Sequence, residues 1–452
     1  MRKQMLHVLV LFTLLALLLA GCAGEMQAPA SAPAAGTTAT ESAAAPAGGK
    51  VQVKLATWAG VDEANELQAI LDKLNAASDT YEIVQESSPA EFWTKLQTTV
   101  AGGTAADLIW MDQEHLPDFA TKGALLDITD MVAGSDSPAA KLDDYFPASL
   151  ERYTVDGKLY GLPWVAMPVM LYVNLDALEA AGYSADQVNG WTWQDFQDAC
   201  VKMTLDANGS NPGADGFDSA TVKQYGFSMV PGWPPLQQFI WQAGGEVLSE
   251  DLKQSPIDTP EALKGAQFVA DLATKSQCMP GQSVISERGF GEMMKAGQVA
   301  MFMGGATDDF ERTEGKRIQG FLLPKGPVNR DSWAWIGGMS INKATKNPDA
   351  AFKAFMDLTE ATHEWKAPAP RKSMATREGI IKAVPYKEIS ADNIVANMEN
   401  MHAARIFPGY AQWATVFGER YVDPLIRGQG TPEELAAQTR PLLEQTLQEA
   451  GQ

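Results

Sequence analysis

The chain has 452 residues and a formal net charge of −21, with 56 acidic side chains against 35 Lys and Arg. A chain this acidic lacks the clustered cations that neutralise phosphates, so we expect no nucleic-acid partner. Three cysteines and four histidines, at no ligand-like spacing, argue against a disulfide framework and against a His-based metal site. No cofactor and no metal are therefore expected.

The first residues predict an export signal that ends in a lipid anchor. Arg2 and Lys3 precede a mostly aliphatic run, Val8–Leu19, which is shorter than the roughly 20 residues of a membrane-spanning helix. The small residues before Cys22 resemble the lipobox of bacterial lipoproteins, in which the cysteine is acylated, for example with palmitate. We predict residues 1–21 as a signal peptide and Cys22 as the lipidation site. An uncleaved membrane anchor is the alternative.

Residues 22–49 are predicted to be a disordered tether. From Ala23 to Gly49 the chain is almost all Ala, Pro, Gly, Ser, Thr and Gln, which bury too little apolar surface to offset the entropy of ordering. Beyond Gly49 no apolar run is long enough to cross a bilayer. We expect an extracytoplasmic body, anchored to the outer face of the cell membrane or on its periplasmic side, that touches membrane only through lipid.

The body begins with alternating strand and helix patterns. Val51–Leu55 alternates apolar and polar residues like a strand, and Glu66–Ala77 has apolar residues at helical spacing. Tyr81–Val84 returns to strand character, Phe92–Val100 is a helical stripe, and Asp107–Met111 is a short apolar strand. This alternation predicts an α/β fold with a mostly parallel sheet, in which ligands gather at the carboxyl ends of the strands.

A series of short motifs resembles one bacterial family in the same order along the chain. The matching segments include Glu91–Leu96, Ala101–Asp112, Lys122–Asp127, Asp156–Trp164, Leu171–Asp176, Gly190–Phe196, Tyr225–Phe227, Gly244–Gly245, Lys295–Met301, Leu323–Gly326, Gly337–Gly338, Asn347–Phe352 and Pro370–Ser373. Each motif alone is a few residues of turn and packing chemistry. Together they resemble the extracellular solute-binding proteins of bacterial ABC importers, of the sugar-binding, maltose-binding-protein-like type.

The resemblance implies a two-lobed periplasmic-binding-protein fold of type II, each lobe a mostly parallel sheet flanked by helices. It places lobe 1 at residues 50–163 and 325–362, and lobe 2 at residues 164–324 and 363–452. It also implies a monomer that closes on a carbohydrate, of two or more sugar units, and delivers it to the transmembrane subunits of an ABC permease. Whether Cys200 and Cys278 form a disulfide stays open, because an oxidising compartment permits but does not require it.

Several tryptophans are candidate ligand platforms, since a sugar site combines flat aromatic rings with polar groups around the edge. The predicted platforms, near strand ends, Gly or Pro, are Trp58, Trp164, Trp233, Trp241 and Trp335. The resemblance favours Trp241 and Trp335, because family members often place an aromatic ring facing the cleft there. Core packing is the alternative for each, and it is the role we expect for Trp191 and Trp193.

Carboxylates are apt rim groups because hydrogen bonds to charged groups contribute about 1.5 to 3 kcal/mol each. Asp112 follows a predicted strand, with Glu114 close behind, and both are predicted to bind ligand. A helix N-cap is the alternative role for Asp112. The acidic loop Asp206–Asn211 departs from a calcium-binding pattern, since Phe217 stands where the twelfth-position Glu belongs.

Three further residues complete the predicted site. The resemblance places Arg371 at a position whose guanidinium often reaches the cleft, with a surface salt bridge as the alternative. Tyr172 lies on a predicted strand of lobe 2, and Thr307 ends a Gly-rich turn that offers a hydroxyl group. No catalytic residue is predicted.

Other functions remain open at this point. A binding protein for another polar solute, such as glycerol phosphate, would use Arg371 with Arg330 or Lys372 as a cationic site. A secreted glycoside hydrolase also combines carboxylates with aromatic rings, but no serine elbow, Walker loop or HExxH motif is present. We predict a protein that is not an enzyme.

Overall fold

The computed structural model describes residues 49–229, 236–402 and 404–451. The chain divides into two units, Met1–Gly49 and Lys50–Gln452. The predictions for residues 1–21, for Cys22, for nearly all of the tether and for Trp233 lie outside the described residues. Among those described, no helix combines the length and the apolar character that crossing a membrane requires.

The first elements follow the predicted pattern. Strand β1 (Val51–Thr57), helix α2 (Val61–Ala77), strand β2 (Tyr81–Ser87), helix α3 (Phe92–Ala101) and strand β3 (Leu108–Asp112) succeed one another. Helix α2 begins earlier than predicted, because its first turn is acidic and carries none of the buried leucines. Acidic side chains favour a helix N-terminus through the helix dipole, a signal that the apolar stripe does not contain.

The remaining elements build one large sheet and its covering helices. The strands are β4 (Thr154–Val155), β5 (Lys158–Leu159), β6 (Leu162–Asn174), β7 (Tyr225–Ser228), β8 (Val299–Gly305), β9 (Ile318–Phe321) and β10 (Ala334–Ile341). The helices are α4 (Leu116–Thr121), α5 (Thr129–Ala133), α6 (Pro147–Leu150), α7 (Leu175–Ala180), α8 (Ala185–Val188), α9 (Trp193–Met203), α10 (Gln237–Gln242), α11 (Pro260–Thr274), α12 (Gln282–Arg288), α13 (Phe290–Lys295), α14 (Pro348–Thr362), α15 (Arg377–Ala383), α16 (Ala391–Met398), α17 (Tyr410–Phe417), α18 (Asp423–Ile426) and α19 (Pro432–Ala450).

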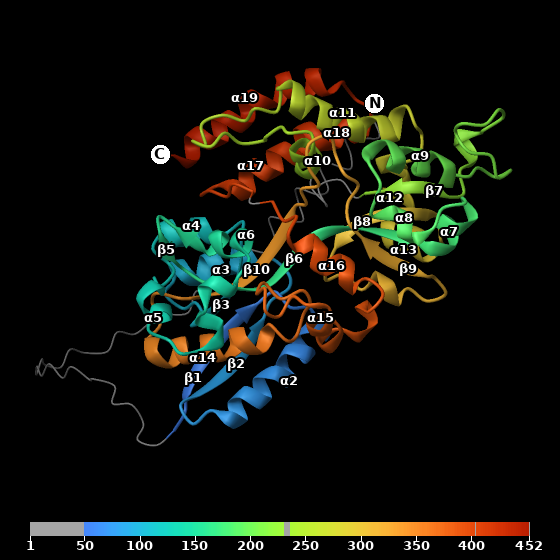
Figure 1. Ribbon diagram of the computed structural model, residues 1–452. Coiled ribbons are helices and arrows are strands. Elements are labelled where there is room, and N and C mark those ends of the chain that lie inside the picture. The colour runs from blue at the N-terminus through green and yellow to red at the C-terminus, as the bar shows by residue number, and fades with distance from the viewer. Residues whose placement is uncertain (1–48, 230–235, 403, 452) are drawn as a thin grey trace, which may run out of the picture. The chain divides into compact units, whose positions relative to one another are not determined.

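The predicted α/β class is confirmed by the sheet, whose strand order is β2-β1-β3-β10-β6-β8-β7, with β9 paired to β6. Strands β2, β1 and β3 run parallel, as do β7 and β8, whereas every antiparallel pair of this sheet includes β6 or β10. Figure 1 shows β6 running from the group of β1 to β3 and β10 to the group of β7 to β9: its first part pairs with β10 and its second part with β8 and β9. Strand β6 is therefore the continuous link between the two halves of the sheet.

Strand β6 contributes to three hydrophobic clusters. Its start, Trp164–Ala166, packs with β1 to β3 and α14. Further along, Val169, Leu171 and Val173 face the helices α9 to α11 and α17 to α19, while Met170 and Tyr172 face α13, α15 and α16. This alternation follows from the two-residue period of a strand. Nothing in these clusters fixes the predicted lobe boundaries, which stay a prediction.

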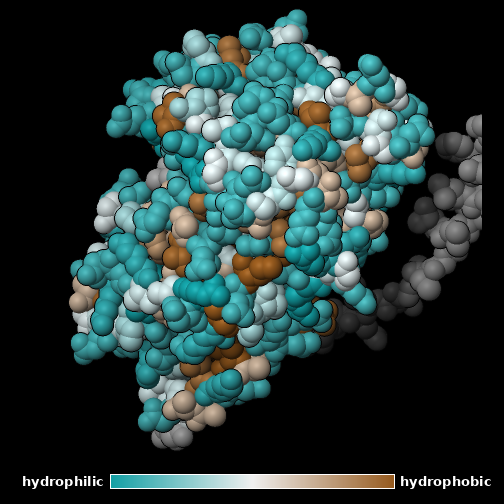
Figure 2. Space-filling model, turned by 45° about the vertical axis from the view of Figure 1, so that its right-hand side comes forward, coloured by the Kyte–Doolittle hydropathy of each residue, from teal (hydrophilic) through white to brown (hydrophobic). Residues whose placement is uncertain are grey.

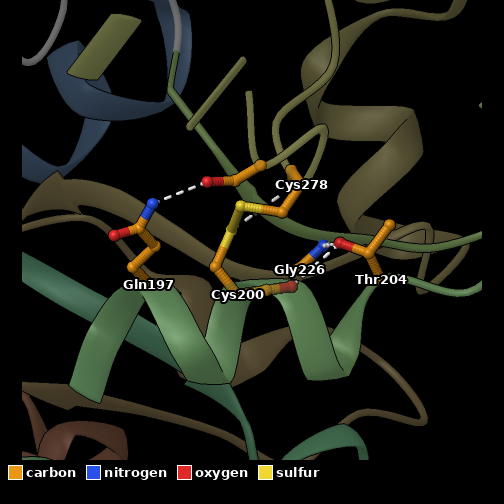
Figure 3. The surroundings of a disulfide bond; sticks show 6 residues. Gln197, Cys200, Thr204, Gly226 and Cys278 are labelled. Atoms are coloured by element: carbon orange, nitrogen blue, oxygen red, sulfur yellow. Dashed lines mark hydrogen bonds between the residues drawn. A yellow bond between two sulfur atoms is a disulfide. The ribbon is translucent and has the colours of Figure 1, made fainter. Parts of the chain in front are cut away.

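A disulfide joins Cys200 on α9 to Cys278, which follows α11, and so resolves the pairing that the sequence left open. Figure 3 shows its surroundings: the Gln197 side chain donates to the Ser276 hydroxyl, and the Gly226 N–H donates to the Thr204 hydroxyl. Any Cβ on Gly226 would lie 1.8 Å from the Cys200 carbonyl oxygen, so this position requires glycine.

Trp191 and Trp193 are core residues, as predicted, with 5% and 8% of their surfaces exposed.

The outer surface in Figure 2 is mainly hydrophilic, with hydrophobic residues gathered toward its centre and lower part. A polar, acidic exterior of this kind keeps a protein soluble through mutual repulsion.

Candidate functional site

The loop after β3 is held by Asp112. One carboxylate oxygen, Oδ1, accepts hydrogen bonds from the backbone N–H groups of Glu114 (3.0 Å) and His115 (2.9 Å) and lies 2.8 Å from His115 Nδ1. These bonds stabilise the turn that leads into α4, whose N-cap is His115 rather than Asp112. The predicted ligand contact of Asp112 remains a prediction.

Glu114 lines a cavity and keeps its carboxylate free. Among the described residues, no hydrogen bond or ion pair reaches the Glu114 carboxylate oxygens. Burial and the neighbouring Asp112 carboxylate raise the pKa of Glu114 to about 7, while His115 acts in the opposite direction. A buried carboxylate without a partner has an unfavourable free energy, which a ligand with hydrogen-bond donors relieves.

We call this space the Tyr410 cavity, with a volume of about 430 Å³. Four separate segments line it: the loop after β3, the start of α10, the residue before β10, and the run from α17 to α18. Its described lining residues are Glu114, Leu236, Gln237, Trp333, Tyr410, Ala411, Ala414, Thr415, Phe417, Gly418, Glu419, Val422 and Asp423. The volume falls in the range of small-molecule sites, roughly 300 to 1,000 Å³.

Gln237 supplies a second unpaired acceptor. Its Nε2 donates to the Tyr410 hydroxyl at 3.2 Å, while its Oε1 is buried and has no hydrogen-bond partner among the described residues. Only 3% of Gln237 is exposed. Burial and the Glu114 carboxylate together raise the pKa of Tyr410, so its hydroxyl keeps its proton.

A π-helical turn, η7 (Gly418–Val422), separates α17 from α18 on the wall of this cavity. Single π-helical turns inside longer helices are rare and are frequent at functional sites. Glu419 lies in this turn and Asp423 directly follows it, so two carboxylates line the cavity in addition to Glu114.

Trp58 and Trp335 are brought together by the fold. Both are half-buried, with ring centroids 6.0 Å apart at 75°. Trp58 also meets Trp93, whose ring stacks on His115 at 3.7 Å, and this stack joins the aromatic group to the Asp112 loop. Trp335 packs against both large hydrophobic clusters. These two tryptophans remain predicted ligand platforms.

Trp164 and Tyr172 have packing roles. Trp164 is 3% exposed, stacks on Trp365 at 5.7 Å, and donates its indole N–H to the Gly338 carbonyl at 3.2 Å. Tyr172 is fully buried, and its hydroxyl donates to the Gly305 carbonyl at 2.8 Å. Because their polar atoms already have protein partners, we leave both out of the proposed ligand contacts.

Arg371 joins two segments of the chain rather than facing the Tyr410 cavity. Its Nε donates to Asp144 at 2.9 Å and its Nη1 to Glu360 at 2.8 Å, and only 6% of the side chain is exposed. The salt-bridge alternative from the sequence therefore describes this arginine, although the pair is buried rather than on the surface.

The Arg371→Lys variant is expected to lower the free energy of unfolding by about 1 to 2 kcal/mol. The reason is that one ammonium group cannot replace a planar guanidinium that donates to two carboxylates at once. Ligand affinity should change less than twofold. Urea unfolding and titration calorimetry measure the two quantities. Arg377→Lys is the matched control, since Arg377 forms exposed ion pairs with Glu388 and Asp392. A large loss of affinity at unchanged stability would contradict the structural role.

Trp241 and Thr307 each contact another side chain of the protein. Trp241 is 2% exposed and stacks on His402 at 4.0 Å, and its indole N–H has no partner among the described residues. The half-buried Thr307 hydroxyl lies 2.7 Å from the Met167 sulfur. Neither residue lines the Tyr410 cavity. Their predicted ligand contacts remain predictions.

The sequence did not identify Gln237, Tyr410, Glu419 or Asp423. All four lie in segments without a motif of the resemblance, and Tyr410 is separated from Glu114 by almost 300 residues. The one local signal was the break at Pro408-Gly409 before a helix. In the structure the Gly409 N–H donates to Asp118 at 3.0 Å, a bond that fixes the start of α17 against α4.

Two other places are less suited to a ligand. A larger hollow of about 660 Å³, lined by residues that include Lys122, Asn342 and Lys343, contains no predicted site residue. The Asp206 carboxylate accepts backbone N–H groups from its own loop and from Asp218, so it already has partners within the protein. Among the described residues, no cluster of three or more His, Cys, Asp or Glu could hold a metal.

The sequence matches a known protein family. Residues 60–358 match the model of the bacterial extracellular solute-binding proteins. The chain belongs to this family. One relative of this solute-binding protein is a putative binding protein of Brucella abortus, 24% identical over 75% of this chain and 79% of the relative. Another is the arabinooligosaccharide-binding protein of Bacillus subtilis, 23% identical over 80% of this chain and 78% of the relative.

The fold of this solute-binding protein also matches solved structures. An ABC substrate-binding protein from Listeria monocytogenes, in complex with cycloalternan, has a TM-score of 0.74 at 20% identity, covering 88% of this chain and 99% of that one. At this identity the match concerns the fold. It confirms the predicted two-domain solute-binding architecture.

Proposed function

We propose that this solute-binding protein captures a carbohydrate in the Tyr410 cavity and delivers it to the permease of an ABC importer. The observation that carries the proposal is the cavity lining, in which aromatic rings lie beside acceptors without partners. Trp333 and Tyr410 offer apolar faces to C–H groups, and Glu114 and Gln237 Oε1 accept from hydroxyls. This combination suits a polar ring with apolar faces.

Family membership and the relatives support the same substrate class. The Bacillus subtilis relative is named for arabinooligosaccharides, and the Listeria monocytogenes structure contains cycloalternan. Trp58 and Trp335 lie near the loop that carries Glu114 and would extend the contact surface for a ligand of two or more sugar units.

A cavity lined with carboxylates argues against glycerol phosphate or another anion as the solute. The lining contains Glu114, Glu419 and Asp423 and includes no Lys or Arg among its described residues. An anion placed there would meet like charges in a partly buried site, which is unfavourable.

We also propose that the protein binds its solute without chemical conversion. Glycoside hydrolysis needs two carboxyl groups flanking the scissile bond. Here Glu114 and Asp423 are half-buried and Glu419 is exposed, an arrangement that suits recognition. A turnover assay with aryl glycosides tests this, and measurable hydrolysis would contradict it.

The predicted lobes give the capture mechanism. Glu114 and Trp333 belong to predicted lobe 1 (50–163 and 325–362), and Gln237 and Tyr410 belong to predicted lobe 2 (164–324 and 363–452). A ligand that contacts both sets favours the closed arrangement, with β6 as the connecting strand. Lipidation at Cys22 and a tether to residue 49 would keep this body near its permease as a monomer.

Titration calorimetry of residues 50–452 with a panel of mono- and oligosaccharides tests the proposal. We expect at least one carbohydrate to bind with micromolar affinity or better. Absence of binding to every carbohydrate, together with tight binding of another polar solute such as glycerol 3-phosphate, would overturn the carbohydrate assignment.

A further inference from the structure

The polar groups that the Tyr410 cavity leaves without partners are hydrogen-bond acceptors. Gln237 Oε1 is buried and unpaired among the described residues, while Nε2 of the same amide donates to the Tyr410 hydroxyl. The Glu114 carboxylate adds two more acceptor oxygens that have no donor. A ligand that satisfies these groups must present donors rather than acceptors.

The charges of the lining residues also favour a ligand that presents hydrogen-bond donors. Glu114, Glu419 and Asp423 all line the cavity, while the described lining contains no Lys, Arg or His. The cavity is therefore anionic as well as rich in acceptors.

Two arginines close to the cavity have other partners. Arg152, whose charge acts against the rise of the Tyr410 pKa, donates to the carbonyls of Ala404 and His402, and burial lowers the pKa of Arg152 to about 10. Arg427 lies 3.9 Å from Asp423 and is exposed.

His115, the remaining nearby base, lies against the Asp112 carboxylate and stacks on Trp93. Neither arginine lines the cavity, and His115 does not line it either, so none of these side chains pairs with the Glu114 carboxylate there.

Building on the proposed function, we propose that the carbohydrate bound in this cavity carries a protonated amine, so that the ligand is an amino sugar. Its ammonium group would donate to the Glu114 carboxylate and to Gln237 Oε1. An ammonium has three donors and no acceptor, which matches this lining better than a hydroxyl does.

Two further features favour a cation here. The rings of Trp333 and Tyr410 line the same cavity, and aromatic faces attract cations. Burial holds the Glu114 pKa near 7, so an ammonium beside it would restore the ionised form. Binding at pH 6 should then release a proton from Glu114.

The test compares matched pairs of ligands on residues 50–452 by titration calorimetry at pH 6. The pairs are glucose and glucosamine, galactose and galactosamine, mannose and mannosamine, and cellobiose with its diamino analogue of the same linkage. In at least one pair the amino member should bind ten or more times tighter, with proton release seen as a dependence of the heat on the buffer. Added salt should reduce the preference.

The variants separate this inference from the proposed function. Glu114→Gln should reduce the preference for the amino member to below threefold, whereas Glu250→Gln, an exposed glutamate outside the cavity, should leave it unchanged. Equal or tighter binding of the neutral member in every pair that binds would overturn the amino-sugar inference and leave the carbohydrate function standing. Absence of binding to every member of these pairs would also overturn the amino-sugar inference, whereas the carbohydrate function is decided by the wider panel and by glycerol 3-phosphate.

Discussion

At pH 8 the Glu114→Gln variant is expected to unfold with a higher free energy than the native protein, by about 1 to 3 kcal/mol. Glu114 has a pKa of about 7 in the folded protein against 4.5 for the unperturbed group. Between these values the folded chain holds a proton that the unfolded chain has lost, so the free energy of unfolding decreases as pH rises from 4.5 to 7. A neutral Gln removes this penalty, and the half-buried position keeps the gain below the full linkage value.

The same variant should bind its carbohydrate about ten times more weakly, because hydrogen bonds to a charged acceptor are stronger than those to a neutral one. Urea unfolding at pH 4.5 and pH 8 and calorimetric titration provide the two readouts. The gain in stability should vanish at pH 4.5, and Glu250→Gln should show no gain at either pH. A variant that is destabilised at pH 8 with unchanged affinity would show that Glu114 serves the fold rather than the ligand.

Loss of the Lys387 ammonium is expected to be the most destabilising of the substitutions considered. Lys387 is fully buried, lies 3.1 Å from the Glu311 carboxylate, and donates to the Asp308 carbonyl. Burial lowers the pKa of Lys387, and Glu311 opposes that shift. Lys387→Met leaves Glu311 as a buried charge without its partner, so the free energy of unfolding should fall by about 3 to 5 kcal/mol.

Two further variants test whether the loss of stability comes from breaking the Lys387–Glu311 ion pair. Replacing both partners, Lys387→Met with Glu311→Leu, should recover most of the stability, because two apolar groups leave no buried charge. Lys382→Met is the matched control, since Lys382 and Glu364 form an ion pair with 69% and 58% of their side chains exposed, and such pairs contribute about 0 to 1 kcal/mol. Urea unfolding of all three measures the differences. Equal losses in the single and double variants would argue against an ion-pair origin.

The early part of the fold could be predicted because its signals are local. The alternation in β1 and the stripe in α2 each follow from which residues face a core, and both elements appear where the pattern indicates. The predicted start of α2 lies too late in the chain. The first turn of the helix is acidic, so it contains no apolar periodicity that would mark it as helical. Family motifs then supplied the two-domain architecture, which no local pattern contains.

The candidate site was only partly predictable. Glu114 was identified because it follows a strand at the carboxyl edge of the sheet, a position fixed by local pattern and topology. Trp164 and Tyr172 follow similar patterns but are buried with satisfied polar atoms, because strand periodicity does not say which face meets solvent. Tyr410 and Gln237 could not be paired with Glu114 from sequence, since only the folded chain brings these segments together.

A crystal structure of residues 50–452 with the tightest carbohydrate from the titration panel would locate the binding site. We expect ligand density in the Tyr410 cavity, with a donor of the ligand within hydrogen-bond distance of Glu114 and of Gln237 Oε1. Density in another place, such as the hollow beside Lys122 and Lys343, with the Tyr410 cavity holding only water, would contradict it.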